Sequence, residues 1–324
     1  MPKSDPIENA LNTIGELRHE AALERVTKEL RSFLKHRSNL VVAKAAKVAC
    51  ELRLPELAPD LAAAFQRFMA DPAKHDKRCA ALTEIVTALY ELDYLEPGPY
   101  LRTLHHVQME GSFGPPVDAA AALRGISAQA LLRTRYPDAL SEVLPLLVDR
   151  EPAARLGAVR ALGANGGGPG RLLLRLKVLT GDDDPDVLAE CFSGLLAAEP
   201  EQSLAFVARY LDDIEETTAE AAIWALGQSR LAPALEALKE KWERTMDASV
   251  RKVLAGAMAA SRLPGATEFL CAQVQKASTQ VASDVLAALT PYSSSEALAR
   301  AVGAAVEKRG EPKLMEQFRR EFAV

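Results

Sequence analysis

The segment TTAEAAIWALG, residues Thr217–Gly227, indicates the architecture because sequences like it recur along the chain. The clearest relatives are GAVRALG at 157–163, ECFSGLL at 190–196, VLAGAMA at 253–259 and DVLAALT at 284–290. Their aligned Leu or Met positions lie 31 to 33 residues apart. A constant period of this length is typical of a protein built from repeated helical units.

Longer apolar segments lie between these small-residue stretches, for example DALSEVLPLLVD at 138–149 and EQSLAFVARYLDD at 201–213. Each unit therefore reads as a pair of antiparallel helices. Hydrophobic residues make up 48% of the chain and aromatic residues 5%, and the abundant Ala and Leu favour helix. Such a pair cannot bury its apolar faces alone, so neighbours must stack. The sequence predicts an all-α protein, an α-solenoid of about eight stacked helical hairpins.

The segments EPAARLGAVRALG at 151–163 and DPDVLAECFSGLL at 184–196 resemble short HEAT-like repeats. The second helix of such a repeat reads similarly to D-P-x-V-R-x-x-A-A-x-A-L-G. The resemblance is good from about Pro116 to Leu289 and looser before it. It implies an armadillo-type α-solenoid, similar to the HEAT-like repeats of bilin lyases.

The two ends of the chain differ from the repeats. We expect capping helices over residues 1–37, a HEAT-like array over 38–290 and capping helices over 291–324. Within the array, residues 38–115 are divergent and residues 116–290 are regular. The final segment carries Leu314, Phe318 and Phe322 at a spacing of four, as in an amphipathic helix. Caps are expected because the terminal repeats of a solenoid would otherwise expose their core.

The formal net charge of −5 argues against a general nucleic-acid binder, because phosphate neutralisation needs a basic face. The acidic runs GDDDPD at 181–186 and DDIEE at 212–216 are read either as solvated loops or as a site for a basic partner. The N-terminus lacks the apolar region of a signal peptide, and no apolar run reaches about 18 residues. We therefore expect a soluble, cytoplasmic protein that does not enter the membrane.

No motif in the sequence indicates a cofactor or a metal. The four cysteines lie far apart inside apolar helical stretches, so buried free thiols are expected rather than a disulfide or a zinc site. All five histidines precede residue 107, which excludes a metal centre repeated in both halves of the chain, as in HEAT-like di-iron hydroxylases. The run GGGPG at 166–170 lacks the Lys-Ser/Thr ending of a phosphate-binding loop and is expected to be a flexible connection.

The resemblance to HEAT-like repeats implies a non-enzymatic scaffold or adaptor that binds a protein or peptide on its concave surface. The alternative is a HEAT-like enzyme or enzyme subunit, of the DNA alkyl-base glycosylase type or the bilin lyase type. An enzyme needs converging carboxylate, His or Cys side chains in a pocket, whereas a scaffold needs a broad groove. A DNA-binding groove would draw its basic residues from Lys44, Lys47, Arg155, Arg160, Arg251 and Lys252.

Trp224 is the central candidate for partner binding. In this repeat type the second helices line the concave surface, and the variable position of A-A-x-A-L-G faces away from the core. Trp224 occupies that position and is expected to be at least half exposed. It either anchors a partner or packs between repeats. With its expected neighbours it forms the predicted partner-binding set of Arg160, Trp224, Glu220 and Lys252.

The segment EGSFGPPVD at 110–118 is the second candidate site, because it lies in the one unit stretched to 42 residues. Phe113 in this segment is either packed against a helix pair or exposed as a contact residue. The other tryptophan, Trp242, is expected to pack in or beside its own helix.

Overall fold

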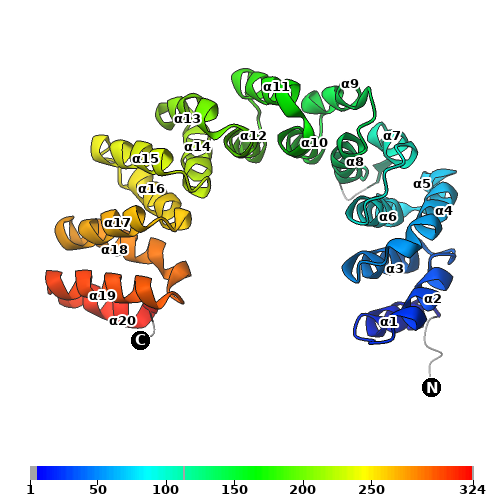
Figure 1. The fold of residues 1–324 in the computed structure, drawn as a ribbon, viewed down its shortest axis with the longest axis horizontal. Helices are drawn as coiled ribbons and strands as arrows, with labels where there is room; N and C mark the ends of the chain where they lie inside the picture. Colours follow the sequence, from blue (N-terminus) through cyan, green and yellow to red (C-terminus); the bar gives the residue numbers. More distant parts are fainter. Residues whose placement is uncertain (1–5, 112–113, 323–324) are drawn as a thin grey trace. The chain divides into compact units, whose positions relative to one another are not determined.

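The computed structural model describes residues 6–111 and 114–322 (Figure 1). These residues are mostly helical, and the only strands among them are β1 (Met109–Glu110) and β2 (Val117–Asp118). The predicted all-α class is therefore confirmed. The chain divides into two compact units, Met1–Gly170 and Arg171–Val324.

Unit 1 consists of two layers of helices. We call them layer A and layer B. In layer B, each helix packs against the next one in the layer, as the blue to green ribbons of Figure 1 show. Layer B of unit 1 contains α1 (Pro6–Leu17), α3 (Asn39–Glu51), α6 (Ala80–Glu91), α8 (Ala121–Arg133) and α10 (Pro152–Asn165). Layer A contains α2 (Leu23–Phe33), η1 (Pro55–Leu57), α4 (Ala58–Met69), α5 (Pro72–His75), η2 (Lys77–Cys79), α7 (Gly98–Leu104), α9 (Ala139–Val143) and η3 (Leu144–Val148).

Unit 2 has the same two layers. Layer B of unit 2 contains α12 (Pro185–Ala198), α14 (Glu216–Gln228), α16 (Ala248–Ser261), α18 (Thr279–Leu289) and α20 (Pro312–Phe322). Layer A contains α11 (Gly167–Thr180), which begins at the end of unit 1, α13 (Pro200–Ala208), η4 (Arg209–Asp212), α15 (Ala232–Arg244), α17 (Pro264–Lys276), η5 (Thr290–Tyr292) and α19 (Glu296–Arg309). The predicted apolar face of the last helix is confirmed, since Leu314 and Phe322 are buried and Phe318 stacks on Phe322.

Small residues let the layer B helices approach closely. A side chain at Gly157 of α10 would fall on the backbone of Gly125 in α8, and one at Gly227 of α14 would fall on the backbone of Ala257 in α16. Glycine is required at these positions because no side chain could fit between the two main chains. The small residues of the repeated stretch are thus the contact surface of layer B.

The glycine run at 166–170 corrects one expectation. Gly167–Gly170 form the first turn of α11 rather than a flexible connection. Gly167 has a φ of +56°, which glycine adopts without strain, and added side chains at Gly166 or Gly170 would meet the Leu162 carbonyl. The glycines therefore permit a tight turn between α10 and α11.

The segment between α7 and α8 forms a short hairpin. β1 and β2 are antiparallel, with Met109 opposite Asp118 and Glu110 opposite Val117. Phe113, the second candidate residue, lies outside the described residues. Of the helices that are described, none has the length and apolarity needed to cross a bilayer.

Candidate functional site

Trp224 lies on α14 in layer B of unit 2, and its side chain reaches the neighbouring helix. A Cβ atom built at Gly256 of α16 would be 2.9 Å from Cη2 of Trp224, so the ring rests on this glycine. Trp224 is 38% exposed, less than the expected half, because the indole fills the space that Gly256 leaves. The ring is therefore both fixed by the next hairpin and accessible from outside.

Glu220 and Lys252 lie beside Trp224 on the same two helices. Glu220 precedes Trp224 by one turn of α14 and is half-buried, while Lys252 precedes Gly256 by one turn of α16 and is exposed. Unit 2 thus brings three of the four predicted residues onto the α14–α16 surface. Arg160 is exposed on α10 in unit 1, so its participation in the same site stays a prediction.

Trp242 is buried, as predicted. It is 4% exposed, and its indole packs edge-on against the ring of Phe269, with 6.0 Å between ring centroids. The two tryptophans therefore differ in burial. Trp242 fills the space between layer A helices, whereas part of the Trp224 ring is exposed to solvent.

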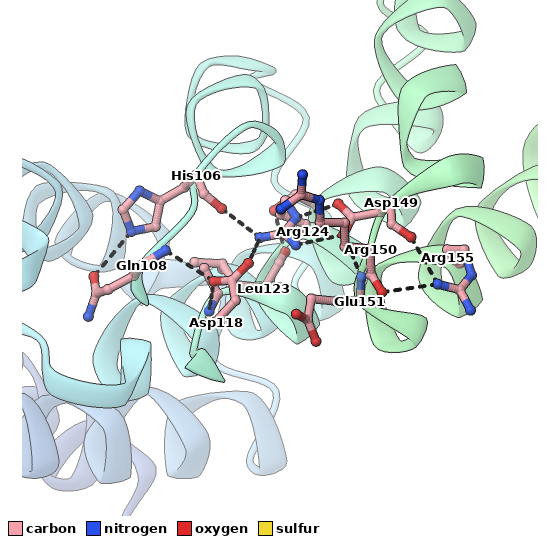
Figure 2. A network of polar contacts seen from close by, with 11 residues as sticks. His106, Gln108, Asp118, Leu123, Arg124, Asp149, Arg150, Glu151 and Arg155 are labelled. Atoms are coloured by element: carbon pink, nitrogen blue, oxygen red, sulfur yellow. Dashed lines mark hydrogen bonds and ion pairs between the residues drawn. The ribbon is translucent and has the colours of Figure 1, made fainter. Parts of the chain in front are cut away.

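A buried polar network in unit 1 is centred on Arg124 of α8 (Figure 2). The Arg124 side chain is 4% exposed and contacts two carboxylates. Its Nη1 donates to Oδ2 of Asp118 at 2.6 Å, and its Nε and Nη2 donate to the two oxygens of Asp149 at 2.9 Å each. Nη1 also donates to the carbonyl of His106 at 2.9 Å. Arg124 thereby ties its own hairpin to the loop that precedes α10.

Asp118 orders the start of α8. Its Oδ1 accepts the backbone N–H groups of Gln108 and Ala120, each at 3.0 Å. Burial by itself raises the pKa of Asp118, but these two N–H groups and Arg124 together lower it by a larger amount. The net pKa therefore lies below the ordinary value. Asp118 is therefore ionised at neutral pH and carries the charge that Arg124 neutralises.

Asp76 has the same role one hairpin earlier. It is fully buried, and its two carboxylate oxygens accept the N–H groups of Ala81 and Leu82 at 2.8 Å in the first turn of α6. The side-chain amide of Asn39 donates to Oδ1 of Asp76 at 3.1 Å. The carbonyl of Asp76 accepts the Gln108 side chain at 2.9 Å, which connects this site to the hairpin of β1 and β2.

Arg155 extends the network into α10. Its Nη1 donates to the carbonyls of Asp149 at 2.9 Å and Arg150 at 3.2 Å. Arg155 is 5% exposed, so it could not contribute to a DNA-binding groove. Its charge serves the loop before α10.

No single motif indicates this network, although the sequence carries a signal for it. Asp118 and Arg124 are six residues apart, as are Asp149 and Arg155, and the second pair follows the first after 31 residues. An Asp-x5-Arg pair that recurs at the repeat period indicates a contact made between neighbouring hairpins. Because its charged groups bond to one another and to the main chain, the network holds the fold and leaves little room for a ligand.

The cysteines and histidines form no reactive centre in the described residues. Burial raises the pKa of Cys79 and of Cys191 to about 12, so both are poor nucleophiles at neutral pH. His105 Nε2 lies 2.8 Å from Oε2 of Glu142 on the surface. Within residues 6–111 and 114–322, no three His, Cys, Asp or Glu side chains are placed to hold a metal ion.

A pocket of about 580 Å³ lies in unit 2 where the α16–α17 turn meets η5 and the start of α19. Its lining is mainly apolar, and it includes Arg262, whose guanidinium lies 5.2 Å from the centre of the Tyr292 ring. Glu268 is the carboxylate of the lining, and neither His nor Cys accompanies it.

Comparison with known proteins gives no family. No family model matches the chain, and no curated protein matches it. An engineered protein of known crystal structure aligns with 99% of this chain and 96% of its own, with 15% sequence identity and a TM-score of 0.35.

Proposed function

We propose that each unit is a segment of HEAT-like α-solenoid and that the chain is a cytoplasmic, non-enzymatic scaffold or adaptor. Its partner, a protein or peptide, binds on layer B, which is the concave surface in arrays of this kind. The observation that carries the proposal is Trp224, a large aromatic side chain that is fixed by Gly256 and still 38% exposed.

A fixed, exposed indole is suited to binding. Trp is among the residues that contribute most to protein interfaces, because its large surface is desolvated when a partner covers it. The contact with Gly256 limits the orientations of the ring before binding, so little side-chain entropy is lost on association. Glu220 and Lys252 supply charges of both signs beside the ring, which favours orientation and specificity.

The two interpretations of Trp224 are compatible in this arrangement. One part of the ring packs on Gly256 of the next hairpin, and another part faces solvent. Arg160 occupies the corresponding repeat position on α10 and is exposed, so we propose it as a partner-contact residue of layer B in unit 1. The proposal thus retains all four residues, with Trp224 as the anchor.

The test is affinity capture from the native cell extract, followed by titration of the purified partner. Trp224→Ala should weaken binding by about thirtyfold or more, the effect of losing a hot-spot side chain worth about 2 kcal/mol. Tyr136→Ala removes another partly exposed aromatic residue, in the turn after α8, and serves as the matched control.

A second variant separates binding from folding. Gly256→Ala keeps Trp224 but displaces its ring, because the added Cβ would lie 2.9 Å from Cη2. It should weaken the same interaction while the circular dichroism spectrum stays helical. Equal partner binding by wild type and both variants, or loss of helicity in Trp224→Ala, would contradict the proposal.

A further inference from the structure

A small pocket opens between two successive hairpins of unit 2, beside the loops that precede α14 and α16. Its volume is about 240 Å³, and its floor is apolar, formed by Leu211, Ile223, Val250 and Val253. Sites for drug-sized molecules usually enclose about 300–1,000 Å³. The pocket is therefore closer in size to one long amino-acid side chain than to a small-molecule ligand.

Two exposed apolar residues flank this pocket. Ile214, which lines it, is 96% exposed, and Met246, which directly precedes the lining residue Asp247, is 82% exposed. Single exposed apolar residues are ordinary, but these two lie on adjacent loops beside an apolar floor. Together they offer apolar surface that a bound chain would cover.

The walls of the pocket are acidic, and two of the acids have structural roles. Asp213 Oδ1 accepts the N–H of Glu215 at 3.0 Å, and Asp247 Oδ1 accepts the N–H of Ser249 at 2.8 Å. These bonds satisfy main-chain donors at the starts of α14 and α16. Their presence near the pocket therefore follows from the fold.

The other two acids, Glu216 and Glu220, are not explained in this way. They are one turn apart on α14, and neither side-chain carboxylate has a hydrogen bond or ion pair to any residue that the structure describes. Lys241, the cation of the lining, is engaged by Asp212, with 2.7 Å between Nζ and Oδ1. Like charges at this spacing destabilise a helix. The helix dipole favours a carboxylate only in the first turn, and Glu220 lies beyond that turn.

We propose that this pocket receives the cationic side chain of an Arg or Lys residue from the protein partner. The aliphatic stem lies on the apolar floor, the charge meets Glu216 and Glu220, and a neighbouring apolar residue of the partner covers Ile214 and Met246. The proposal rests on the proposed function and specifies its partner, because Glu220 lines this pocket and lies one turn from Trp224.

The cation is an organic side chain rather than a metal ion. An inorganic cation such as Ca²⁺ requires six to eight oxygen ligands around one point. Nowhere in the described part of the chain do three or more acidic, His or Cys side chains come close enough to hold a metal. A hydrated ion would make no favourable contact with the apolar floor, whereas the aliphatic stem of Arg or Lys would pack against it.

The isoleucines of the chain provide the test. The sequence has six, of which Ile214 and Ile223 both line the pocket. The other four belong to unit 1 and serve as internal controls: Ile7, Ile14, Ile85 and Ile126. The full-length protein is labelled at its isoleucine methyl groups and titrated with acetyl-Arg-Leu-amide. Acetyl-citrulline-Leu-amide, which has the same shape without the charge, is the matched ligand.

We expect saturable shifts of the Ile214 and Ile223 methyl signals with the arginine dipeptide and unmoved signals from the four isoleucines of unit 1. The double variant Glu216→Gln, Glu220→Gln should weaken binding by about fivefold or more, as expected for loss of two partly exposed charges. The double variant Glu240→Gln, Glu243→Gln removes two charges from the exposed face of α15 outside the pocket and should leave binding unchanged.

Each other result overturns the proposal. Equal shifts with the citrulline dipeptide would show that the charge is not recognised, and the absence of shifts would show that the pocket does not bind this side chain. The titration is independent of the partner, so it can fail while Trp224→Ala still abolishes partner capture. Conversely, Trp224→Ala should leave dipeptide binding intact because Trp224 does not line the pocket.

Discussion

The two units differ in how their charged side chains are neutralised. In unit 1, Arg124 is buried between Asp118 and Asp149, and each charge meets an opposite charge or a main-chain N–H group. In unit 2, Glu216 and Glu220 share one face of α14, and neither carboxylate forms an ion pair with a residue that the structure describes. The first arrangement stabilises the native state and would be costly to break. The second opposes helix stability, because like charges one turn apart repel.

The largest effect is expected from Arg124→Met. It leaves Asp118 and Asp149 without their common cation, and losing one partner of a buried ion pair costs about 3–5 kcal/mol of unfolding free energy. Cys79 in unit 1 and Cys191 in unit 2 are fully buried reporters, so pulsed alkylation in urea, read by mass spectrometry, follows each unit separately. The variant should expose Cys79 at lower urea concentration and leave Cys191 unchanged.

The control for this comparison is Arg133→Met on the same helix. Arg133 pairs with Asp93 at the surface, and an exposed pair of this kind contributes at most about 1 kcal/mol. If the two variants expose Cys79 at the same urea concentration, the buried network does not have the stabilising role assigned to it.

Asp76→Ala should have the next largest effect, a loss of about 2 kcal/mol. It removes the acceptor of two main-chain N–H groups at the start of α6 and of the Asn39 amide, all in a buried setting. Asp76→Asn keeps one acceptor oxygen and should lose less. Chemical unfolding followed by circular dichroism measures both, and an equal loss in the two variants would argue against the hydrogen bonds as the cause.

Acid should weaken unit 1 through Asp118. Its pKa is lowered in the folded state, so the stability it contributes is complete above the unfolded pKa of about 3.9 and is lost as the pH falls toward the folded pKa. Urea unfolding between pH 3 and pH 7 should show wild type losing stability below about pH 4 more steeply than Asp118→Asn. Parallel pH profiles would mean that Asp118 is not the titrating group.

The smallest expected effect is a gain in stability, whereas the variants above lose stability. Glu220→Gln relieves repulsion from Glu216 and should raise stability by no more than about 0.5 kcal/mol, with a larger gain at low salt. Glu236→Gln on α15 removes the partner of Lys239, at 2.9 Å, and should not stabilise. Differential scanning calorimetry of both variants sharpens the comparison, and destabilisation by Glu220→Gln would show that this carboxylate serves the fold.

The helices could be predicted from the sequence because their signals are local. The 31 to 33 residue period and the small residues of the repeated stretch identify layer B, where Gly125 meets Gly157 at close range. The run at 166–170 was misjudged because four of its five residues are glycine, which usually ends a helix. The close approach to Leu162 that makes these glycines necessary is not visible in the sequence.

The candidate site was predictable only in part. The repeat register places Trp224, Glu220 and Lys252 on two adjacent helices, but the exposure of Trp224 depends on how its ring lies on Gly256. The network around Arg124 joins segments that meet only when hairpins stack, so single motifs did not reveal it. The pocket beside Glu216 likewise forms only between two hairpins.

The chain of polar contacts from Asn39 to Arg155 also affects how unit 1 unfolds. In an array whose helices contact mainly their neighbours, the coupling between neighbours sets how many hairpins open together. The contacts that link Asp76 with Gln108, and Arg124 with Asp149, join the starts of α6, α8 and α10. These helices should therefore exchange their amide hydrogens as one cooperative block, at the free energy of opening all of them.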